Sequence, residues 1–203
     1  QRTCLAASLR HFDRAFADDL EDNVVHRAWL QRWLEIVPRY VDWQLDFARA
    51  HRVEAVEVRA ARDDLHPGLI LRGRLDRLDR GAAGTTVIDY KTGAMPGLEE
   101  VLSGAAVQLP FYALLLREPP QRVQYLGLER DKVRAEAALE GADLSELTRA
   151  NTTRLIELTE QLRTGAELPA WGDEHTCEHC FAMPLCRKQS WDDSAPPSGE
   201  TPA

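Results

Sequence analysis

Hydrophobic and polar positions along the chain repeat with two different periods. Residues 69–80 and 85–91 have the alternating, apolar and β-branched character of strands, and the turn Gly81-Ala82-Ala83-Gly84 joins them. Residues 53–59 alternate in the same way, and residues 122–129 predict a further strand. These runs predict a hairpin that is preceded by one strand and followed by another.

Other segments have helical spacing instead. Residues 5–17 are amphipathic, and a longer stretch over 20–50 is expected to be broken or kinked at Pro38. Further helices are expected at 105–116 and 144–163. Strands in the middle with helices before and after predict an α/β fold, in which helices flank a mixed central sheet.

Composition divides the chain unequally. Residues 1–191 are long enough for one domain with a substantial core, within which 170–191 form a Cys-rich segment. Residues 192–203 have the composition of a disordered tail. The chain begins at Gln1 without an initiator Met, so we expect a piece of a longer protein.

Net charge and hydropathy limit the partners and the cellular location that we expect for the protein. A net charge of −8 argues weakly against a protein that coats nucleic acid, but bound metal or local basic patches can dominate one groove. Four arginines surround the hairpin: Arg72, Arg74, Arg77 and Arg80. The sequence contains neither an apolar run of transmembrane length nor a leader-like start, so we expect a cytoplasmic protein with no membrane partner.

Three charged residues interrupt the central strand-like runs: Asp76 in the first, and Asp89 and Lys91 in the second. Alternate side chains of a strand share a face, so Asp89 and Lys91 point the same way, and Asp76 can reach them across the hairpin. Two carboxylates and an ammonium suit a hard divalent cation beside a polarised water, as phosphodiester hydrolysis requires. The alternative is a solvated strand face, although Asp is disfavoured in strands.

The spacing of Asp76, Asp89 and Lys91 resembles the active-site signature of the PD-(D/E)xK nuclease superfamily. Residues 73–80 and 87–93 are similar to its RecB/AddB branch. The resemblance implies a restriction-endonuclease-like fold in which Asp76 and Asp89 hold Mg²⁺ or Mn²⁺. Lys91 would position the attacking water and stabilise the transition state, and the neighbouring carboxylates favour its charged form over a free-amine base.

The same resemblance extends to neighbouring segments. His26, on an upstream helix, and the backbone carbonyl of Tyr90 are implied as further metal ligands. Gln108 and Tyr112 lie four residues apart on one helical face and resemble the branch's Gln-x-x-x-Tyr helix, which implies a catalytic role in contacting DNA or orienting the site. The alternative for His26 is an ordinary histidine on a helix face. The alternative for Gln108 and Tyr112 is a pair that caps the core. Glu57 either adds a carboxylate or lies on a solvated face.

Cysteines occur only near the two ends of the chain: Cys4, Cys177, Cys180 and Cys186. Three of them within ten residues indicate a soft-ligand metal site rather than disulfides in a reducing compartment. The layout resembles the [4Fe–4S] site of AddB-type nucleases and CRISPR-associated Fe–S exonucleases, which implies a structural cluster that joins the two ends of the domain. Zinc is the alternative, with His175 or His179 as fourth ligand.

The resemblance as a whole implies a Mg²⁺-dependent deoxyribonuclease, an exonuclease acting in double-strand-break processing and recombinational repair. The resemblance implies the C-terminal nuclease domain of an AddB-like helicase–nuclease subunit. Its partners would be DNA, as single-stranded ends or unwound duplex, and a helicase–nuclease partner subunit. The alternatives are a stand-alone CRISPR-associated Fe–S exonuclease and a non-catalytic DNA-binding scaffold with the same fold.

Overall fold

A computed structural model describes residues 5–11, 24–167, 177–178 and 180–186. Its contacts divide the chain into two units, Gln1–Thr159 and Glu160–Ala203. The first unit contains the whole sheet and the predicted active-site residues.

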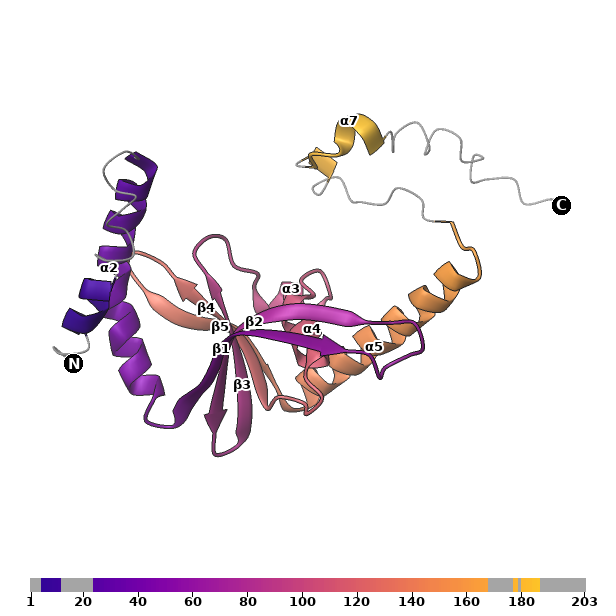
Figure 1. Ribbon diagram of the computed structural model, residues 1–203, viewed down its shortest axis with the longest axis horizontal. Helices are drawn as coiled ribbons and strands as arrows, with labels where there is room; N and C mark the ends of the chain where they lie inside the picture. The colour runs from indigo at the N-terminus through magenta and orange to yellow at the C-terminus, as the bar shows by residue number, and fades with distance from the viewer. Residues whose placement is uncertain (1–4, 12–23, 168–176, 179, 187–203) are drawn as a thin grey trace. The chain divides into compact units, whose positions relative to one another are not determined.

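A five-stranded mixed sheet forms the centre of the first unit (Figure 1). Its strands lie side by side in chain order: β1 His51–Arg62, β2 Leu71–Gly81, β3 Gly84–Lys91, β4 Arg122–Leu128 and β5 Val133–Glu140. Only the β3–β4 pair is parallel, and the other three pairs are antiparallel. The mixed sheet predicted from the alternating runs is therefore confirmed.

Helices precede, interrupt and follow the strands. They are α2 Val24–Phe47, α3 Leu98–Leu102, α4 Gln108–Leu115, α5 Gly141–Arg163, which crosses the division between the units, and α7 Met183–Cys186 in the second unit. Residues 5–11 are also helical. The parallel β3–β4 pair needs a crossover connection, and the segment that contains α3 and α4 supplies it.

Two hydrophobic clusters lie on opposite faces of the sheet. Val87 belongs to the cluster that contains α4 side chains such as Leu109, whereas its neighbour Ile88 packs with Ile36 of α2. This division follows from the pleat, because adjacent residues of a strand point to opposite faces. Burying each such side chain contributes about 1.5–3 kcal/mol. The strand that carries the site is therefore held from both sides.

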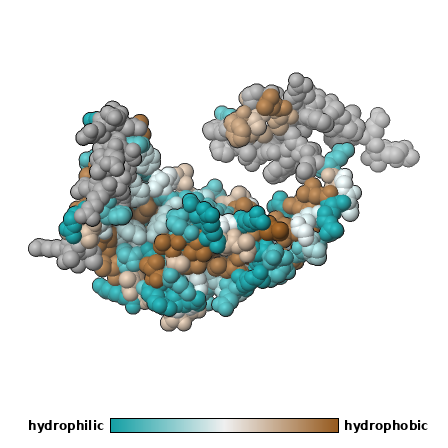
Figure 2. Space-filling model, viewed as in Figure 1, coloured by the Kyte–Doolittle hydropathy of each residue, from teal (hydrophilic) through white to brown (hydrophobic). Residues whose placement is uncertain are grey.

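The surface of the first unit is mixed in character. Figure 2 shows hydrophilic residues over much of the visible face, with a hydrophobic area near its middle. Exposed apolar side chains also occur on the edge strand β1, at Val53 and Val56. Among the residues that the structure describes, no helix combines the length and apolar character needed to span a membrane.

Pro38 was expected to break or kink its helix, and the break does not occur. Helix α2 runs through this residue without interruption from Val24 to Phe47. Ile36, Val37 and Val41 on either side are buried. Their burial offsets the roughly 3 kcal/mol that an interior proline costs a helix.

Strand β5 is a difference from the sequence-based expectation. Its sequence, VRAEAALE, carries small and charged residues rather than the β-branched ones that mark a strand. Its pairing with β4 shifts register beside Gln124, where Ala137 adopts a left-handed φ of 48°. A bulge of this kind hides the regular alternation by which a strand is recognised. Helix α3 likewise lies in a segment for which the sequence pattern predicted no element.

Candidate active site

Asp76 lies where β2 and β3 separate. Backbone pairing between these strands ends at Arg77 and Ile88, one position before Asp76 and Asp89. The Oδ2 atom of Asp76 accepts a hydrogen bond from the backbone N–H of Tyr90 at 3.0 Å. A side chain thus replaces the missing ladder bond and fixes the Asp76 carboxylate beside the end of β3.

Asp89 and Lys91 form an ion pair at this point. The lysine Nζ lies 2.9 Å from Asp89 Oδ2, with the Asp89 side chain only 3% exposed and that of Lys91 25% exposed. The ammonium also lies 5.1 Å from the centre of the Tyr125 ring, within the range of a cation–π contact. The two charged side chains therefore stand on one face of β3, as the period-2 geometry requires.

Helix α4 contributes a third group to this pair. Gln108 accepts a hydrogen bond from Lys91 Nζ at 2.7 Å and donates one to Asp89 Oδ1 at 2.8 Å. Its amide group also donates to the Tyr112 hydroxyl at 2.9 Å, one helical turn further on. Residues from β3 and α4 thus form one closed hydrogen-bonded cluster, with Asp76 beside it.

Burial and charge change the acid–base behaviour of the cluster. Burial raises the pKa of the Asp89 carboxyl, the Lys91 ammonium opposes this shift, and the negative charge of Asp76 reinforces it. Burial also raises the pKa of Tyr112, and it raises that of Tyr125 to about 12 with a further contribution from the charge of Asp89. Both tyrosines are therefore neutral hydroxyls near physiological pH.

These residues suit a hard divalent cation. Asp76 and Asp89 provide carboxylate oxygens, the ligands that Mg²⁺ and Mn²⁺ prefer. The charge of Asp76 already disfavours ionisation of Asp89. A divalent cation between the carboxylates would replace that repulsion with attraction.

His26 is the predicted metal ligand that the structure does not group with Asp76 and Asp89. It lies on α2, and its side chain is half-buried. Within the described part of the chain, no three His, Cys, Asp or Glu side chains come close enough together to hold one metal ion. The set of His26, Asp76 and Asp89 is thus not assembled here, and His26 as a ligand stays a prediction. The same is true of the Tyr90 carbonyl.

Glu57 lies on the strand next to Asp76, but its carboxylate is engaged with an arginine. Glu57 Oε2 lies 3.0 Å from Arg74 Nε, and both side chains are about 60% exposed. Its backbone has a left-handed φ of 53°, between the pairs Val56–Arg77 and Val58–Leu75. Its additional-carboxylate role stays a prediction.

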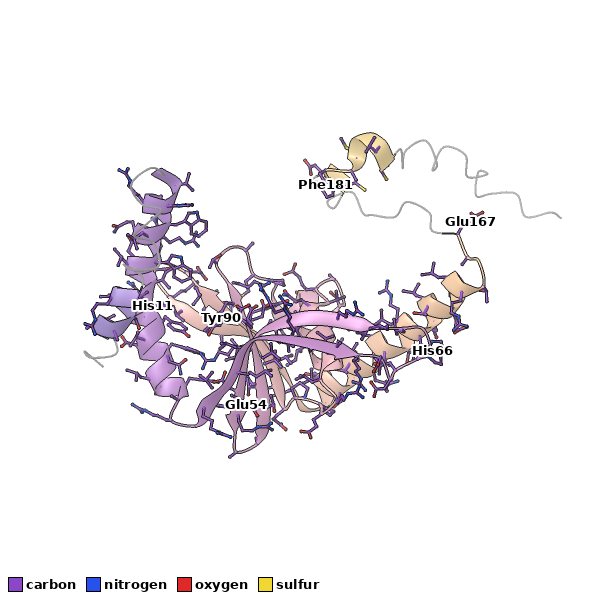
Figure 3. The ribbon with its side chains drawn as sticks, viewed as in Figure 1. His11, Glu54, His66, Tyr90, Glu167 and Phe181 are labelled. Atoms are coloured by element: carbon purple, nitrogen blue, oxygen red, sulfur yellow. The ribbon has the colours of Figure 1, made fainter. Side chains whose placement is uncertain are left out.

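Tyr90 is labelled in Figure 3 and lies on the other face of β3, where it packs with side chains of α2. Its hydroxyl lies 3.0 Å from the Tyr40 hydroxyl of α2 and accepts a hydrogen bond from Arg77 at 3.1 Å. Arg77 also donates to Gln44 of α2 and makes two bonds to Asp79. This network, missed in the sequence reasoning, fixes the residue between Asp89 and Lys91.

Arg77 therefore does not add to a basic surface around the hairpin, contrary to expectation. Its side chain is 2% exposed and Asp79 is fully buried. Arg80 is paired with Glu54 at 3.1 Å, and the other two arginines remain exposed. The alternation of Leu75, Arg77 and Asp79 is the signal that could have revealed the buried pair, because all three occupy the buried positions of β2.

The cysteine site lies partly outside the described residues, which exclude Cys4, His175 and His179. In the second unit the structure describes three half-buried cysteines with free thiols: Cys177, Cys180 and Cys186. The backbone N–H of Cys180 donates to the Cys177 carbonyl at 3.2 Å in a tight turn. The turn brings the backbones of Cys177 and Cys180 together, but the three described thiols do not form a group that could hold one metal ion, and their metal stays a prediction.

The site thus combines two carboxylates, a lysine and a helix-borne glutamine at the point where two strands of a mixed sheet separate. The model of the PD-(D/E)XK nuclease superfamily matches residues 1–187. The chain belongs to this superfamily, and nuclease activity is the general function that the membership indicates.

Comparison with other proteins adds distant structural neighbours. No match is found among curated proteins. The crystal structure of SSO0001 is 16% identical, with 91% of this chain and 81% of that chain covered and a TM-score of 0.44. Protein VC1899 from Vibrio cholerae is also 16% identical, with 67% and 37% covered and a TM-score of 0.31. The family model alone carries the assignment.

Proposed function

We propose that the chain is a Mg²⁺- or Mn²⁺-dependent DNA exonuclease of the RecB/AddB type. In this proposal it is the nuclease part of a cytoplasmic AddB-like helicase–nuclease, acting with a partner subunit on DNA ends in recombinational repair. The observation that carries the catalytic part is the closed cluster of Asp89, Lys91 and Gln108, whose three contacts measure 2.7–2.9 Å. Asp76 lies beside this cluster through its bond to Tyr90.

Asp76 and Asp89 are the residues that would hold the cation. When bound, a divalent cation supplies positive charge beside the scissile phosphate and makes nearby water easier to deprotonate. Asp89 must be ionised for this, and the burial that raises its pKa also keeps competing water away from its oxygens.

Lys91 would hold the attacking water and stabilise the negative charge that develops on the phosphate oxygens. Its ammonium has three donors, of which Asp89 and Gln108 take two, so one remains to face the substrate. Water then adds to phosphorus, the bond to the leaving oxygen breaks, and the proton lost by water is balanced by the one gained at that oxygen.

Cleavage of end-labelled single-stranded DNA tests this function. The wild-type chain should cleave with Mg²⁺ or Mn²⁺ and stop when EDTA is added, while Asp89→Ala and Lys91→Ala should each lose about 100-fold or more in rate. The matched controls Asp63→Ala and Lys132→Ala remove surface ion pairs and should keep the wild-type rate. Wild-type rates in the two site variants would refute the proposal, and labels at either end give the polarity.

The four cysteines form the second part of the proposal, as ligands of a structural [4Fe–4S] cluster. Their layout supports it, with Cys177 and Cys180 in one tight turn. Anaerobically purified protein should be brown and contain about four iron and four sulfide per chain. Cys180→Ser should lose colour and iron together. A colourless sample that contains one zinc per chain would show a zinc site instead.

A further inference from the structure

Strands β1 and β2 continue as a two-stranded arm past the candidate active site (Figure 1). The arm comprises the paired residues from Val58–Leu75 to Arg62–Leu71, whereas the pairing of β2 with β3 has already ended at Arg77. One face packs against α4, and a Cβ atom added at Gly73 would lie only 2.5 Å from Leu115 Cδ1. Helix α4 therefore covers this face of the arm.

The other face of the arm carries three arginines. Arg59 and Arg74 are directly opposed across the strands, and Arg72 is opposed to Ala61. All three arginine side chains are exposed. Together with Ala60, Ala61 and Gly73 they line an open depression of about 440 Å³.

The charges on this face are only partly balanced by protein groups. Like charges directly opposed across two strands are destabilising. Glu57 pairs with Arg74 at 3.0 Å, and among the described residues Arg59 and Arg72 have no ion-pair partner. This basic face stands on a chain whose net charge is −8. An anionic ligand would turn its mutual repulsion into attraction.

The arm begins at the candidate active site. Arg74 and Arg72 precede Asp76 by two and four residues, which at ~3.3 Å per residue places them about 7 and 13 Å along the strand. These are distances on the scale of neighbouring nucleotides in an extended strand. Guanidinium groups bind phosphate oxygens in a bidentate manner, and exposed arginines keep that capacity available.

We propose that Arg59, Arg72 and Arg74 form a phosphate-binding track for the nucleic acid strand beside the scissile bond. The proposal rests on the nuclease function proposed above and adds the residues that hold the substrate outside the reacting centre. The track recognises backbone phosphates, so it favours no base sequence.

Binding of a fluorescein-labelled oligothymidylate to the full chain tests the track. The measurement uses EDTA, so that nothing is cleaved, and compares the wild type with Arg59→Gln/Arg72→Gln/Arg74→Gln over a range of salt concentrations. The track variant should bind roughly 10-fold or more weakly, and the slope of log Kobs against log salt should be smaller by about 2. A matched control, Arg149→Gln/Arg154→Gln/Arg163→Gln, removes the same charge from exposed positions of α5 and should keep the wild-type slope.

Equal slopes for the track variant and the control would overturn the proposal. So would a track variant that keeps oligothymidylate binding but loses binding of poly-glutamate, because the face would then serve an acidic protein. Cleavage with Mg²⁺ separates this result from the catalytic proposal: the track variant should raise KM and leave kcat unchanged. A protein that binds through the track but never cleaves would refute the nuclease activity alone.

Discussion

Gln108 Oε1 accepts a hydrogen bond from Lys91 Nζ at 2.7 Å, so the first residue of α4 fixes the ammonium at the end of β3. The same amide donates to Asp89. Its oxygen therefore faces the positive ammonium, and its NH₂ group faces the negative carboxylate. This pairing makes Gln108 a positioning residue, which acts on the reaction through its two charged neighbours.

Replacing Gln108 with Ala should slow cleavage by up to about 100-fold, because Lys91 and Asp89 lose the group that orients both of them. Single-turnover cleavage of labelled DNA measures the effect, with kcat falling more than KM rises. Gln161→Ala, on an exposed position of α5, serves as the control and should behave as wild type. A Gln108→Ala variant with the wild-type kcat would show that the bond to Lys91 is only structural.

Replacing Asp89 with Asn should raise the thermal stability of the metal-free protein near neutral pH. Burial raises the pKa of Asp89 in the folded state, so the folded protein binds the proton more tightly than the unfolded chain and loses stability as pH rises through that pKa. The neutral amide of the variant mimics the protonated carboxyl and avoids this loss. The difference in Tm between variant and wild type should therefore vanish below about pH 3.9, the ordinary value for Asp.

Mg²⁺ supplies the check on this prediction. The cation should raise the Tm of the wild type at neutral pH by binding the folded state, and it should have a smaller effect on Asp89→Asn, which lacks one carboxylate. Asp63→Ala is the control and should retain the wild-type response, because Asp63 lies in a surface ion pair with Arg117. An equal Mg²⁺ response in Asp89→Asn would place the cation elsewhere.

Local geometry explains why the central hairpin could be predicted. The strands of 69–80 and 85–91 appear in the structure as β2 and β3, with Gly81 paired to Gly84 across the turn. The face shared by Asp89 and Lys91 follows from an i, i+2 spacing in a strand, which needs no tertiary information.

Interactions between distant segments explain most of what the sequence did not reveal. Arg77 is buried because Gln44 and Tyr40, more than thirty residues earlier in the chain, supply acceptors on α2. Alternation along β2 places Arg77 at a buried position, but it does not reveal the α2 groups that pair with it. Pro38 remains within α2 for a similar reason, because its neighbours pack against the sheet.

Gly84→Ala should destabilise the fold by about 1 kcal/mol or more, because the residue that closes the β2–β3 hairpin has a φ of +136°, which suits only glycine. An added Cβ would also lie 3.2 Å from the Cβ of Gln121. Urea unfolding measures the change. Gly93→Ala is the matched control, since nothing lies within 4 Å of its added Cβ, and its midpoint should stay near wild type. Equal midpoints for the two variants would contradict this account of the turn.

The buried pair of Arg77 and Asp79 should show strong coupling in a double-mutant cycle. Burial alone would lower the pKa of Arg77, but the bonds to Asp79 and Tyr90 raise it, so the charged form is held firmly. Asp79→Ala leaves this charge buried without its partner and should cost about 3–5 kcal/mol of unfolding free energy. Adding Arg77→Ala should then cost much less than it does alone. The surface pair of Glu54 and Arg80 serves as control, with a coupling below about 1 kcal/mol. Additive effects at Arg77 and Asp79 would contradict the network that anchors Tyr90.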